Sequence, residues 1–415
     1  MHSSDVIIIG GGLVGMTLAL ALDAHGLSSA VVDSADLSTT LAPGFDGRAS
    51  AIASASARMF EAIGLMERLA PHGCAINEIR VTDGLSPLHL HFDAREGDTG
   101  PLGYMFENRV LRVALIEAAK EAPNLRLFAP ARYRDIRREA TGATVELDDG
   151  TVLTAPLVIA ADGRRSAVRE AAGIRTGRWQ YDHTAIVTMI EHEVPHGNIA
   201  FELFYPTGPF AILPMKAAGA PNGATDAVPG TRSAIVWSVR SEDAPAYLEL
   251  PERAMVAELE KRMGGFLGEL RLIAPRSSYP LGFHHAERYI DERLALIGDA
   301  AHGIHPIAGQ GLNMGLRDVA TLAEVLVEAA RLGLDLGEPA VLERYQRWRR
   351  LDNAMVAGAT DLLTRLFGIP GRPAAAVRRL GLAAVHRLPP LKRFFMAEAR
   401  GETGDLPKLL QGLAV

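Results

Sequence analysis

The sequence has a single cysteine, few aromatic residues and no long apolar run. Cys74 is the one cysteine among 415 residues, which excludes an internal disulfide and fits a reducing compartment. A membrane span takes about 20 apolar residues, and the first apolar stretch covers only residues 6–9. No basic segment or cleavage site surrounds this stretch, so we expect no signal peptide.

The chain also lacks an excess of positive charge. Its formal net charge is -6, which gives no bias toward polyanions, so we expect no nucleic-acid partner. The hydrophobic share of 48% and charged share of 22% are ordinary for a globular protein long enough for more than one domain. We expect a cytoplasmic protein, with any membrane contact peripheral and on the inner face.

A glycine-rich turn follows the first apolar strand. It matches G-x-G-x-x-G at Gly10, Gly12 and Gly15, and an Ala- and Leu-rich helix follows it. The first glycine makes the turn, the second lets the backbone approach a pyrophosphate, and the third lets the helix pack on the strand. Backbone N–H groups at the helix N-terminus, which includes Leu13 and Val14, would then meet the phosphates.

An acid at the end of the second apolar strand supports this interpretation. Asp33 lies 18 residues beyond Gly15, near the spacing of about 20 expected for a carboxylate that binds a ribose hydroxyl. The glycines alone would fit a plain tight turn equally well. Strand, glycines, helix, strand and acid in this order predict dinucleotide binding.

Two further pairs of glycine and acid follow buried strands, at Asp162-Gly163 and Gly298-Asp299. Asp162-Gly163 alone would indicate a plain turn. A nicotinamide dehydrogenase needs only the first glycine motif, so the additional pairs favour FAD as the dinucleotide. Asp299 is placed to accept hydrogen bonds from the ribityl hydroxyls.

A glycine-rich stretch over residues 306–313 leads into a helix predicted over residues 314–330. It offers backbone N–H groups at a helix N-terminus, which in an FAD enzyme stabilise the negative charge of the reduced ring. Asn313 would offer both a donor and an acceptor to the pyrimidine edge of the flavin.

These motifs, in this order, resemble the class A flavoprotein aromatic hydroxylases, and in particular the hydroxylases of ubiquinone biosynthesis. The resemblance covers about residues 5–360. The segments that carry it are Asp46-Gly47-Arg48-Ala49, Glu107-Asn108-Arg109-Val110-Leu111, Ala161-Asp162-Gly163-Arg164-Arg165-Ser166, Gly298-Asp299-Ala300-Ala301-His302 and His305-Pro306-Ile307-Ala308-Gly309-Gln310-Gly311-Leu312-Asn313.

The resemblance implies a role for each motif. Arg48 would reach the cofactor, Asn108 would lie beside the flavin, and Asp162 would lie near the cofactor and the approaching nicotinamide. Pro306 and Gly311 would line the ring. The predicted cofactor-binding residues are Gly10, Gly12, Leu13, Val14, Gly15, Asp33, Arg48, Asn108, Asp162, Asp299, Gly309, Gly311, Leu312 and Asn313.

The candidate catalytic residues are His305 and Pro306, which would face the flavin. A free phenol has a pKa near 10, so a group that helps it toward phenolate would be useful. His302 and His305 are the nearest candidates within the flavin motif. The competing interpretation is that either histidine is packed or orients the backbone. We predict no metal site.

The implied fold class is α/β. A Rossmann-like FAD-binding domain of the GR2 type would carry an inserted antiparallel-sheet substrate domain and a basic amphipathic helical tail. The expected divisions are residues 1–76, 103–182 and 278–362 for the FAD-binding domain, 77–102 and 183–277 for the substrate domain, and 363–415 for the tail.

Alternating apolar and polar residues predict the strands of the substrate domain, over residues 184–191, 200–205, 209–215 and 233–240. A loop of open role would cover residues 216–232. Four apolar residues either line a substrate pocket beneath this sheet or belong to its core: Phe201, Phe204, Phe210 and Pro214.

The resemblance implies an FAD-dependent monooxygenase that hydroxylates a phenolic, polyprenylated ring with NAD(P)H and O2 through a C4a-hydroperoxyflavin. NADH or NADPH would bind transiently, because the chain has no second complete glycine motif for it. One alternative is a related FAD oxidoreductase without ring hydroxylation, such as a reductase of isoprenoid double bonds. Another is a non-catalytic flavin-binding subunit. The halogenase motif W-x-W-x-I-P is absent from the sequence.

Positive charge is concentrated near the end of the chain. Residues 364–400 hold eight Lys or Arg against one acid, Glu398, and apolar residues recur there at helical spacing. A basic amphipathic segment suits an anionic membrane surface or a partner in a biosynthetic complex. It is equally compatible with packing on the protein itself.

Overall fold

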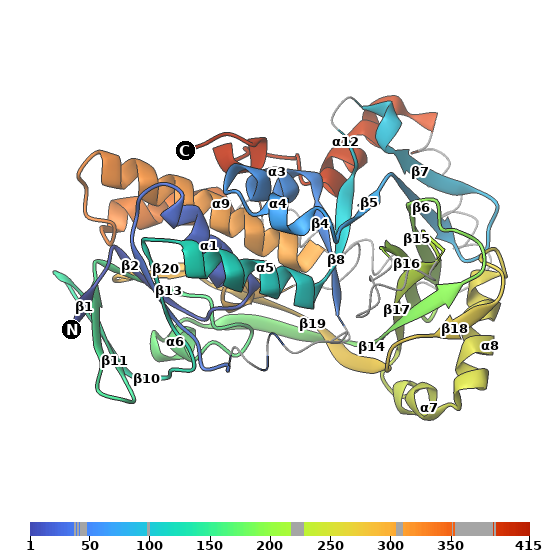
Figure 1. Cartoon of the computed structure of the whole chain (residues 1–415), viewed down its shortest axis with the longest axis horizontal. Coiled ribbons are helices and arrows are strands. Elements are labelled where there is room, and N and C mark those ends of the chain that lie inside the picture. Colours follow the sequence, from blue (N-terminus) through green and yellow to red (C-terminus); the bar gives the residue numbers. More distant parts are fainter. Residues whose placement is uncertain are drawn as a thin grey trace.

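The computed structural model describes most of the chain. The described residues are 1–36, 39, 41, 48–97, 100–216, 228–303, 310–350, 352, 385 and 387–415. Figure 1 shows an elongated molecule in which the two termini lie with a helix-covered sheet on one side, while a larger sheet occupies the other.

A six-stranded sheet forms the first half, in the order β20-β21-β13-β2-β3-β9. Its interior strands are fully buried runs of Val, Ile, Leu and Ala, the composition typical of parallel strands covered on both faces. Five are parallel, and β20 (Ile290–Asp291) is antiparallel at the edge. The parallel strands are β21 (Leu294–Leu296), β13 (Leu157–Ala160), β2 (Val6–Ile9), β3 (Ser29–Val32) and β9 (Leu125–Phe128).

Helices cover this sheet, and α1 (Leu13–Asp23) contacts both α5 (Asn108–Glu121) and α9 (Gln310–Arg331) (Figure 1). Apolar residues at helical spacing bury one side of α9, since Val319 and Leu326 are fully buried. The shorter helices of this half are α3 (Ser54–Ala62), α4 (Met66–Leu69), α6 (Ala167–Ala171), η2 (Gly298–Ala300) and η4 (Lys408–Gln411).

Two small sheets complete this half. One has the order β1-β12-β11-β10 and the other β4-β8-β5. The second carries Arg48 and Asn108 next to its strand ends. The strands are β1 (His2–Ser3), β12 (Val152–Ala155), β11 (Gly142–Leu147), β10 (Tyr133–Glu139), β4 (Ala49–Ala53), β8 (Gly103–Glu107) and β5 (Cys74–Ile76).

A nine-stranded sheet forms the second half, in the order β22-β19-β14-β17-β16-β15-β6-β7, with β18 paired to β14. The four strands predicted for this sheet are present. The members are β22 (His302–Gly303), β19 (Ser277–Ala286), β14 (Thr176–His192), β17 (Arg232–Arg240), β16 (Gly208–Met215), β15 (Ile199–Tyr205), β6 (Glu78–Asp83), β7 (His89–Asp93) and β18 (Leu270–Leu272).

The strands of this sheet cross the expected domain boundaries. The boundary after residue 182 falls inside β14, and the one after residue 277 falls within β19. Both strands continue toward the six-stranded sheet, so the two halves share uninterrupted backbone. The division of the chain into these domains stays a prediction.

The two faces of the nine-stranded sheet have different coverings. One packs against α7 (Ala244–Glu249) and α8 (Glu252–Met263), and Phe210 belongs to this layer with Phe201 packed against it. The other packs against β5 and β8 and against α12 (Pro389–Arg400), and it holds Phe204. Of the three phenylalanines considered for a pocket, only Phe204 therefore faces the other half of the molecule.

The last part of the chain is docked on the protein. Lys392 pairs with Glu96 of η1 (Ala94–Glu96) at 2.6 Å, and buried Arg400 donates to the carbonyl of Gly100 at 3.2 Å. Leu410 of η4 is fully buried in the main core. Four basic residues of the tail lie outside the described residues, namely Arg365, Arg372, Arg378 and Arg379.

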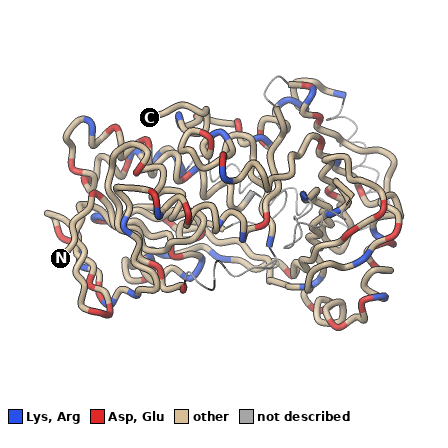
Figure 2. The backbone as a smooth tube through the Cα atoms, in the orientation of Figure 1, with Lys and Arg blue, Asp and Glu red and all other residues tan. Residues whose placement is uncertain are grey.

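Charge of both signs is spread over the described backbone (Figure 2). Docking neutralises part of the positive charge of the tail, since Lys392 has a carboxylate partner. Across the described ranges, no helix combines the length and apolarity that crossing a membrane requires.

Candidate functional site

Three sequence motifs meet at the carboxyl edge of the six-stranded sheet. A Cβ on Gly10 would lie 2.4 Å from the carbonyl oxygen of Ala161, and one on Gly15 would lie 2.0 Å from that of Gly10. Gly10 also has φ of 107°, which side chains rarely adopt. A Cβ on Gly298 would lie 3.2 Å from the Val14 side chain. The motif at residues 10–15 therefore contacts both the segment around Asp162-Gly163 and the one around Gly298-Asp299.

The N-terminus of α1 offers a place for an anion. Gly12 is its N-cap, is exposed, and has nothing within 4 Å of an added Cβ. The first turn contains no acid, and no side chain caps it. The first N–H groups of a helix lack intrahelical partners, so those of the turn that begins at Leu13 suit a phosphate.

Asp33 lies at the tip of β3, beside the glycine turn. Its Oδ2 accepts a hydrogen bond from the Gly11 N–H at 2.6 Å, and its Oδ1 accepts one from the Ala35 N–H at 2.7 Å. These bonds hold the carboxylate next to the glycines. Each carboxylate oxygen can accept a second hydrogen bond, which a ribose hydroxyl could donate.

Asp162 lies at the tip of the neighbouring strand β13. Its Oδ2 accepts from the Val168 N–H at 3.3 Å, while its Oδ1 is buried without a hydrogen-bond partner among the described residues. Burial raises the pKa of Asp162, against the hydrogen bonds from Ser166 and Val168. Buried polar atoms are normally paired, so Oδ1 fits a group that a ligand or water completes.

Asp299 lies just after β21 and is exposed, while its main-chain carbonyl is held by a hydrogen bond. His284 of β19 donates from Nε2 to the Asp299 carbonyl at 2.8 Å. Burial lowers the pKa of His284 to about 4, so its ring is neutral at neutral pH. The nine-stranded sheet thus holds the motif at Gly298-Asp299 in place and leaves the Asp299 carboxylate at the surface.

The sequence interpretation did not include the buried carboxylate of α9, Asp318, which anchors the third motif. Its Oδ2 accepts from the Gly298 N–H at 2.9 Å and from His302 Nε2 at 2.6 Å, and its Oδ1 accepts from Arg349 Nε at 2.7 Å. Burial acts to raise the pKa of Asp318, but His302 and Arg349 lower it to about 2. His302 is therefore a buried partner of Asp318, as the packed-histidine interpretation expects.

The side-chain amide of Asn313 is held by residues of β4 and α3. Its Nδ2 donates to the Ala51 carbonyl at 2.8 Å, and its Oδ1 accepts from the Ala53 N–H at 2.9 Å and the Ser56 hydroxyl at 3.0 Å. The side chain is only 4% exposed, and its amide joins α9 to β4 and α3. The expected use of this amide for the pyrimidine edge stays a prediction. A cofactor contact from the Asn313 main chain stays a prediction.

Arg48 and Asn108 come together at the start of α5. The Asn108 N–H donates to the Arg48 carbonyl at 3.1 Å, and the Ser50 hydroxyl donates to Asn108 Oδ1 at 2.6 Å. Tyr279 of β19 shares this neighbourhood. Burial raises the pKa of Tyr279, whereas the charges of Arg48 and Arg164 lower it. Alternation in the sequence indicates strands here but does not show that Tyr279 faces these arginines.

Three predicted residues of the flavin motif, His305, Pro306 and Gly309, lie outside the described residues. Gly311 and Leu312 belong to the first turn of α9, where Leu312 packs against the core. Their roles stay predictions. Among the residues that the structure describes, no group of His, Cys, Asp and Glu could hold a metal ion.

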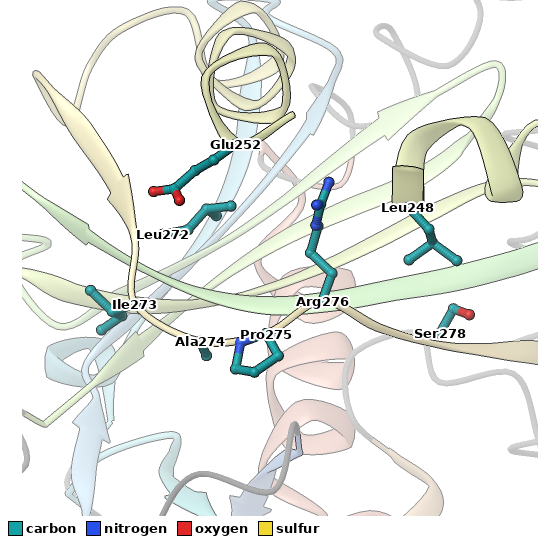
Figure 3. Close-up of a pocket in the computed structure, with 8 residues that line it drawn as sticks. All are labelled: Leu248, Glu252, Leu272, Ile273, Ala274, Pro275, Arg276 and Ser278. Carbon is teal, nitrogen blue, oxygen red and sulfur yellow. The ribbon is translucent and has the colours of Figure 1, made fainter. Parts of the chain in front are cut away.

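A cavity of about 680 Å³ lies in the other half, where α7 and α8 meet the segment between β18 and β19 (Figure 3). Arg276 at its rim donates to the Leu250 carbonyl at 2.7 Å. None of the predicted site residues lines it. The lining residues are Leu248, Glu252, Leu272, Ile273, Ala274, Pro275, Arg276 and Ser278.

Known proteins resemble this chain over nearly its whole length. Residues 3–358 match the family described as FAD binding domain. The chain is 50% identical to a ubiquinone hydroxylase of Rhodospirillum rubrum, over 99% of this chain and 93% of that protein. It is 35% identical to the 3-demethoxyubiquinol 3-hydroxylase of Escherichia coli, over 96% of this chain and 98% of the relative.

Solved structures match the fold as a whole. The crystal structure of p-nitrophenol 4-monooxygenase from Pseudomonas putida superposes with a TM-score of 0.77 at 19% identity. The match covers 98% of this chain and 100% of that one. At this level of identity the likeness concerns the fold alone, and it extends over both halves of the molecule.

Proposed function

The chain belongs to the FAD-binding domain family, and from this premise we propose that it hydroxylates a phenolic ring in ubiquinone biosynthesis with FAD, NAD(P)H and O2. The observation that carries the proposal is the 50% identity to a ubiquinone hydroxylase along nearly the whole chain. The geometry supports it, because the three motif tips meet at one edge of the sheet.

The residues at that edge fit FAD. The open first turn of α1 would bind the pyrophosphate, Asp33 the adenosine ribose and Asp299 the ribityl chain. The unpaired oxygen of Asp162 would gain a partner. Bound there, FAD supplies the electron transfer and oxygen chemistry of the reaction.

The protein's own residues hold the Gly298-Asp299 motif and orient the cofactor and the substrate. Asp318 fixes the Gly298 N–H, and His284 fixes the Asp299 carbonyl, so the third motif is held from two directions. The charges of Arg48 and Arg164 act on the Tyr279 hydroxyl and lower its pKa against the effect of burial. We propose that these groups help to position the cofactor and the ring of the substrate.

A polyprenyl chain on the substrate would make contact with a membrane surface useful. The exposed side of α12 and its N-cap residue supports such contact, with Leu388 exposed by 52%, Leu391 by 37% and Phe394 by 53%. Arg387 and Arg393 are exposed beside them. Apolar side chains flanked by arginine suit an anionic lipid surface.

The proposal is tested by NAD(P)H oxidation with the FAD-loaded protein and a series of phenols. We expect at least one prenylated phenol to accelerate NAD(P)H oxidation. Mass spectrometry should show that this phenol has gained one oxygen atom. If phenols accelerate oxidation while none gains oxygen, the function is that of an oxidoreductase without hydroxylation. Quinone intermediates that accumulate in a deletion strain would identify the ring position by their missing oxygen.

A further inference from the structure

Glu202 is a buried carboxyl in the middle of the substrate sheet. It lies on β15, in register with Val81 of β6 on one side and Ala211 of β16 on the other, and it is only 9% exposed. Side chains alternate along a strand, so Glu202 shares the face of Ala200 and Phe204. That face packs toward β5, β8 and α12, which belong to the other half of the molecule.

The surroundings of Glu202 are mainly apolar, and one buried acid, Asp83 of β6, shares its face in register with Phe204. In the part of the chain that the structure describes, its carboxyl has no hydrogen-bond or ion-pair partner. The residues of this layer include Ile76, Phe92, Met105, Met189, Phe204, Met215 and Met396. They are mainly methionine, aromatic and aliphatic side chains, which adapt to a flat ring.

Two other acids of the same sheet, Glu191 and Asp93, are paired, unlike Glu202. Glu191 of β14 contacts Arg271 and lies 3.9 Å from Arg232, and Asp93 of β7 pairs with Arg95 at 2.6 Å. A carboxyl that lacks a partner in a mainly apolar layer costs free energy, although the Glu202 oxygens are not among the fully enclosed unpartnered atoms of the described residues. A polar ligand with a hydrogen to donate would remove this cost.

Burial alone raises the pKa of the Glu202 carboxyl to about 7. A substantial share of the carboxylate form is therefore available at neutral pH, and no cation among the described residues forms an ion pair with it. Such a carboxylate is a strong acceptor for an O–H donor in an apolar layer.

We propose that Glu202 binds the substrate, with its carboxylate accepting the hydrogen bond of the phenolic hydroxyl while the ring lies on the apolar layer. This inference rests on the proposed function for the identity of the ring. A phenol matches both features of the place, because it joins one acidic O–H donor to a flat apolar body. The bond would fix which ring carbon faces the flavin.

The test compares a prenylated phenol with its methyl ether, which lacks the donor hydrogen. Binding to the FAD-loaded protein is followed by the change in flavin absorbance, and hydroxylation by product mass. We expect Glu202→Leu to weaken phenol binding and to lower kcat/KM for the phenol, each by roughly tenfold to a hundredfold. Binding of the ether should be nearly unchanged. FAD content should equal that of the wild type.

Two further variants secure the interpretation. Glu202→Gln should recover part of the phenol affinity, because its amide oxygen still accepts a hydrogen bond. Met215→Leu, in the same layer, should leave the ratio of phenol to ether affinity unchanged. Glu202→Met fills the site flexibly and replaces Glu202→Leu if the branched side chain prevents folding.

The proposal is overturned if a folded Glu202→Leu or Glu202→Met protein keeps the wild-type preference for the phenol over the ether. The two proposals fail separately. A wild type that binds the phenol through Glu202 but adds no oxygen would contradict the hydroxylase function alone. A wild type that hydroxylates phenols with no dependence on Glu202 would contradict this inference alone.

Discussion

Asp318 and Glu202 are both buried carboxylates, but the two halves of the molecule treat them in opposite ways. Asp318, in the half with the six-stranded sheet, accepts hydrogen bonds from Gly298, His302 and Arg349. Glu202, in the nine-stranded sheet, has no partner in the described part of the chain. The pKa of the first carboxyl is lowered to about 2, and that of the second is raised to about 7.

The difference shows which buried carboxylate is stabilised by hydrogen bonds from the protein itself. At the proposed cofactor edge the protein's own hydrogen bonds fix Asp318, as preorganised sites require, although one oxygen of Asp162 has no partner among the described residues. The substrate layer keeps one polar group uncompensated, which makes that layer less stable alone and better suited to a donor ligand. Four changes test this comparison, in order of decreasing expected effect.

Asp318→Ala should have the largest effect. It leaves buried Arg349 without one carboxylate and releases the Gly298 N–H, and breaking a buried ion pair costs about 3–5 kcal/mol. Urea denaturation would measure the loss. The matched control is Glu328→Gln on the same helix, where the pairs with Lys408 and Arg344 are partly exposed and contribute about 1 kcal/mol or less. Equal losses for both variants would contradict the anchoring role of Asp318.

Glu202→Gln should stabilise the protein, and only above acidic pH. On folding, the pKa of Glu202 rises from 4.5 to about 7, so the folded state binds more protons between these values and the wild type loses stability as the pH rises through this window. The variant removes that loss, with a gain of at most about 3 kcal/mol at pH 8 and little at pH 4. Denaturation midpoints at both pH values measure it. A gain that is the same at both would show that Glu202 is not buried as described.

Asp299→Ala should weaken FAD binding without unfolding the protein. The carboxylate is exposed, so folding does not depend on it, whereas a hydrogen bond to a charged group corresponds to roughly tenfold to a hundredfold in affinity. Fluorescence titration with FAD would measure the change. Asp149→Ala, another exposed acid, is the control. Unchanged FAD affinity in Asp299→Ala would remove the ribityl site from the cofactor edge.

Replacing Arg387 and Arg393 by serine should have the smallest effect, limited to lipid binding. Each exposed arginine near an anionic surface contributes about 1 kcal/mol, or about fivefold in affinity. Co-sedimentation with vesicles of neutral and anionic lipid would measure it, and turnover of a water-soluble phenol should not change. Equal sedimentation of wild type and variant with anionic vesicles would count against membrane contact through α12.

Local pattern was enough to predict the cofactor edge. Buried apolar runs predict β2, β13 and β21, and parallel strands end at one edge, so the residues after them had to meet. The four strands β14 to β17 were predicted from alternation in the same way. The parallel pairing of β6 with β15 was not predicted, because it joins segments distant in the chain.

The roles of Asp318, Asn313 and Glu202 depend on tertiary contacts, which local sequence patterns do not reveal. Asp318 reads as an ordinary polar residue of a helix until Arg349, 31 residues further on, folds against it. Asn313 stands in the most specific motif, yet its amide is used by β4 and α3, which come 257 or more residues earlier. Burial of Glu202 depends in turn on β5, β8 and α12, which lie far from it in sequence.

The central claim, that this chain is a flavin-dependent hydroxylase of a phenolic ring, is tested most directly by isotope labelling. The FAD-loaded protein is reduced with NAD(P)H and mixed with a prenylated phenol under ¹⁸O2, and the product is weighed by mass spectrometry. The account predicts that the ring gains one ¹⁸O atom and that none is gained from labelled water. Oxidation of NAD(P)H with the phenol recovered unlabelled, for every phenol tried, would contradict it.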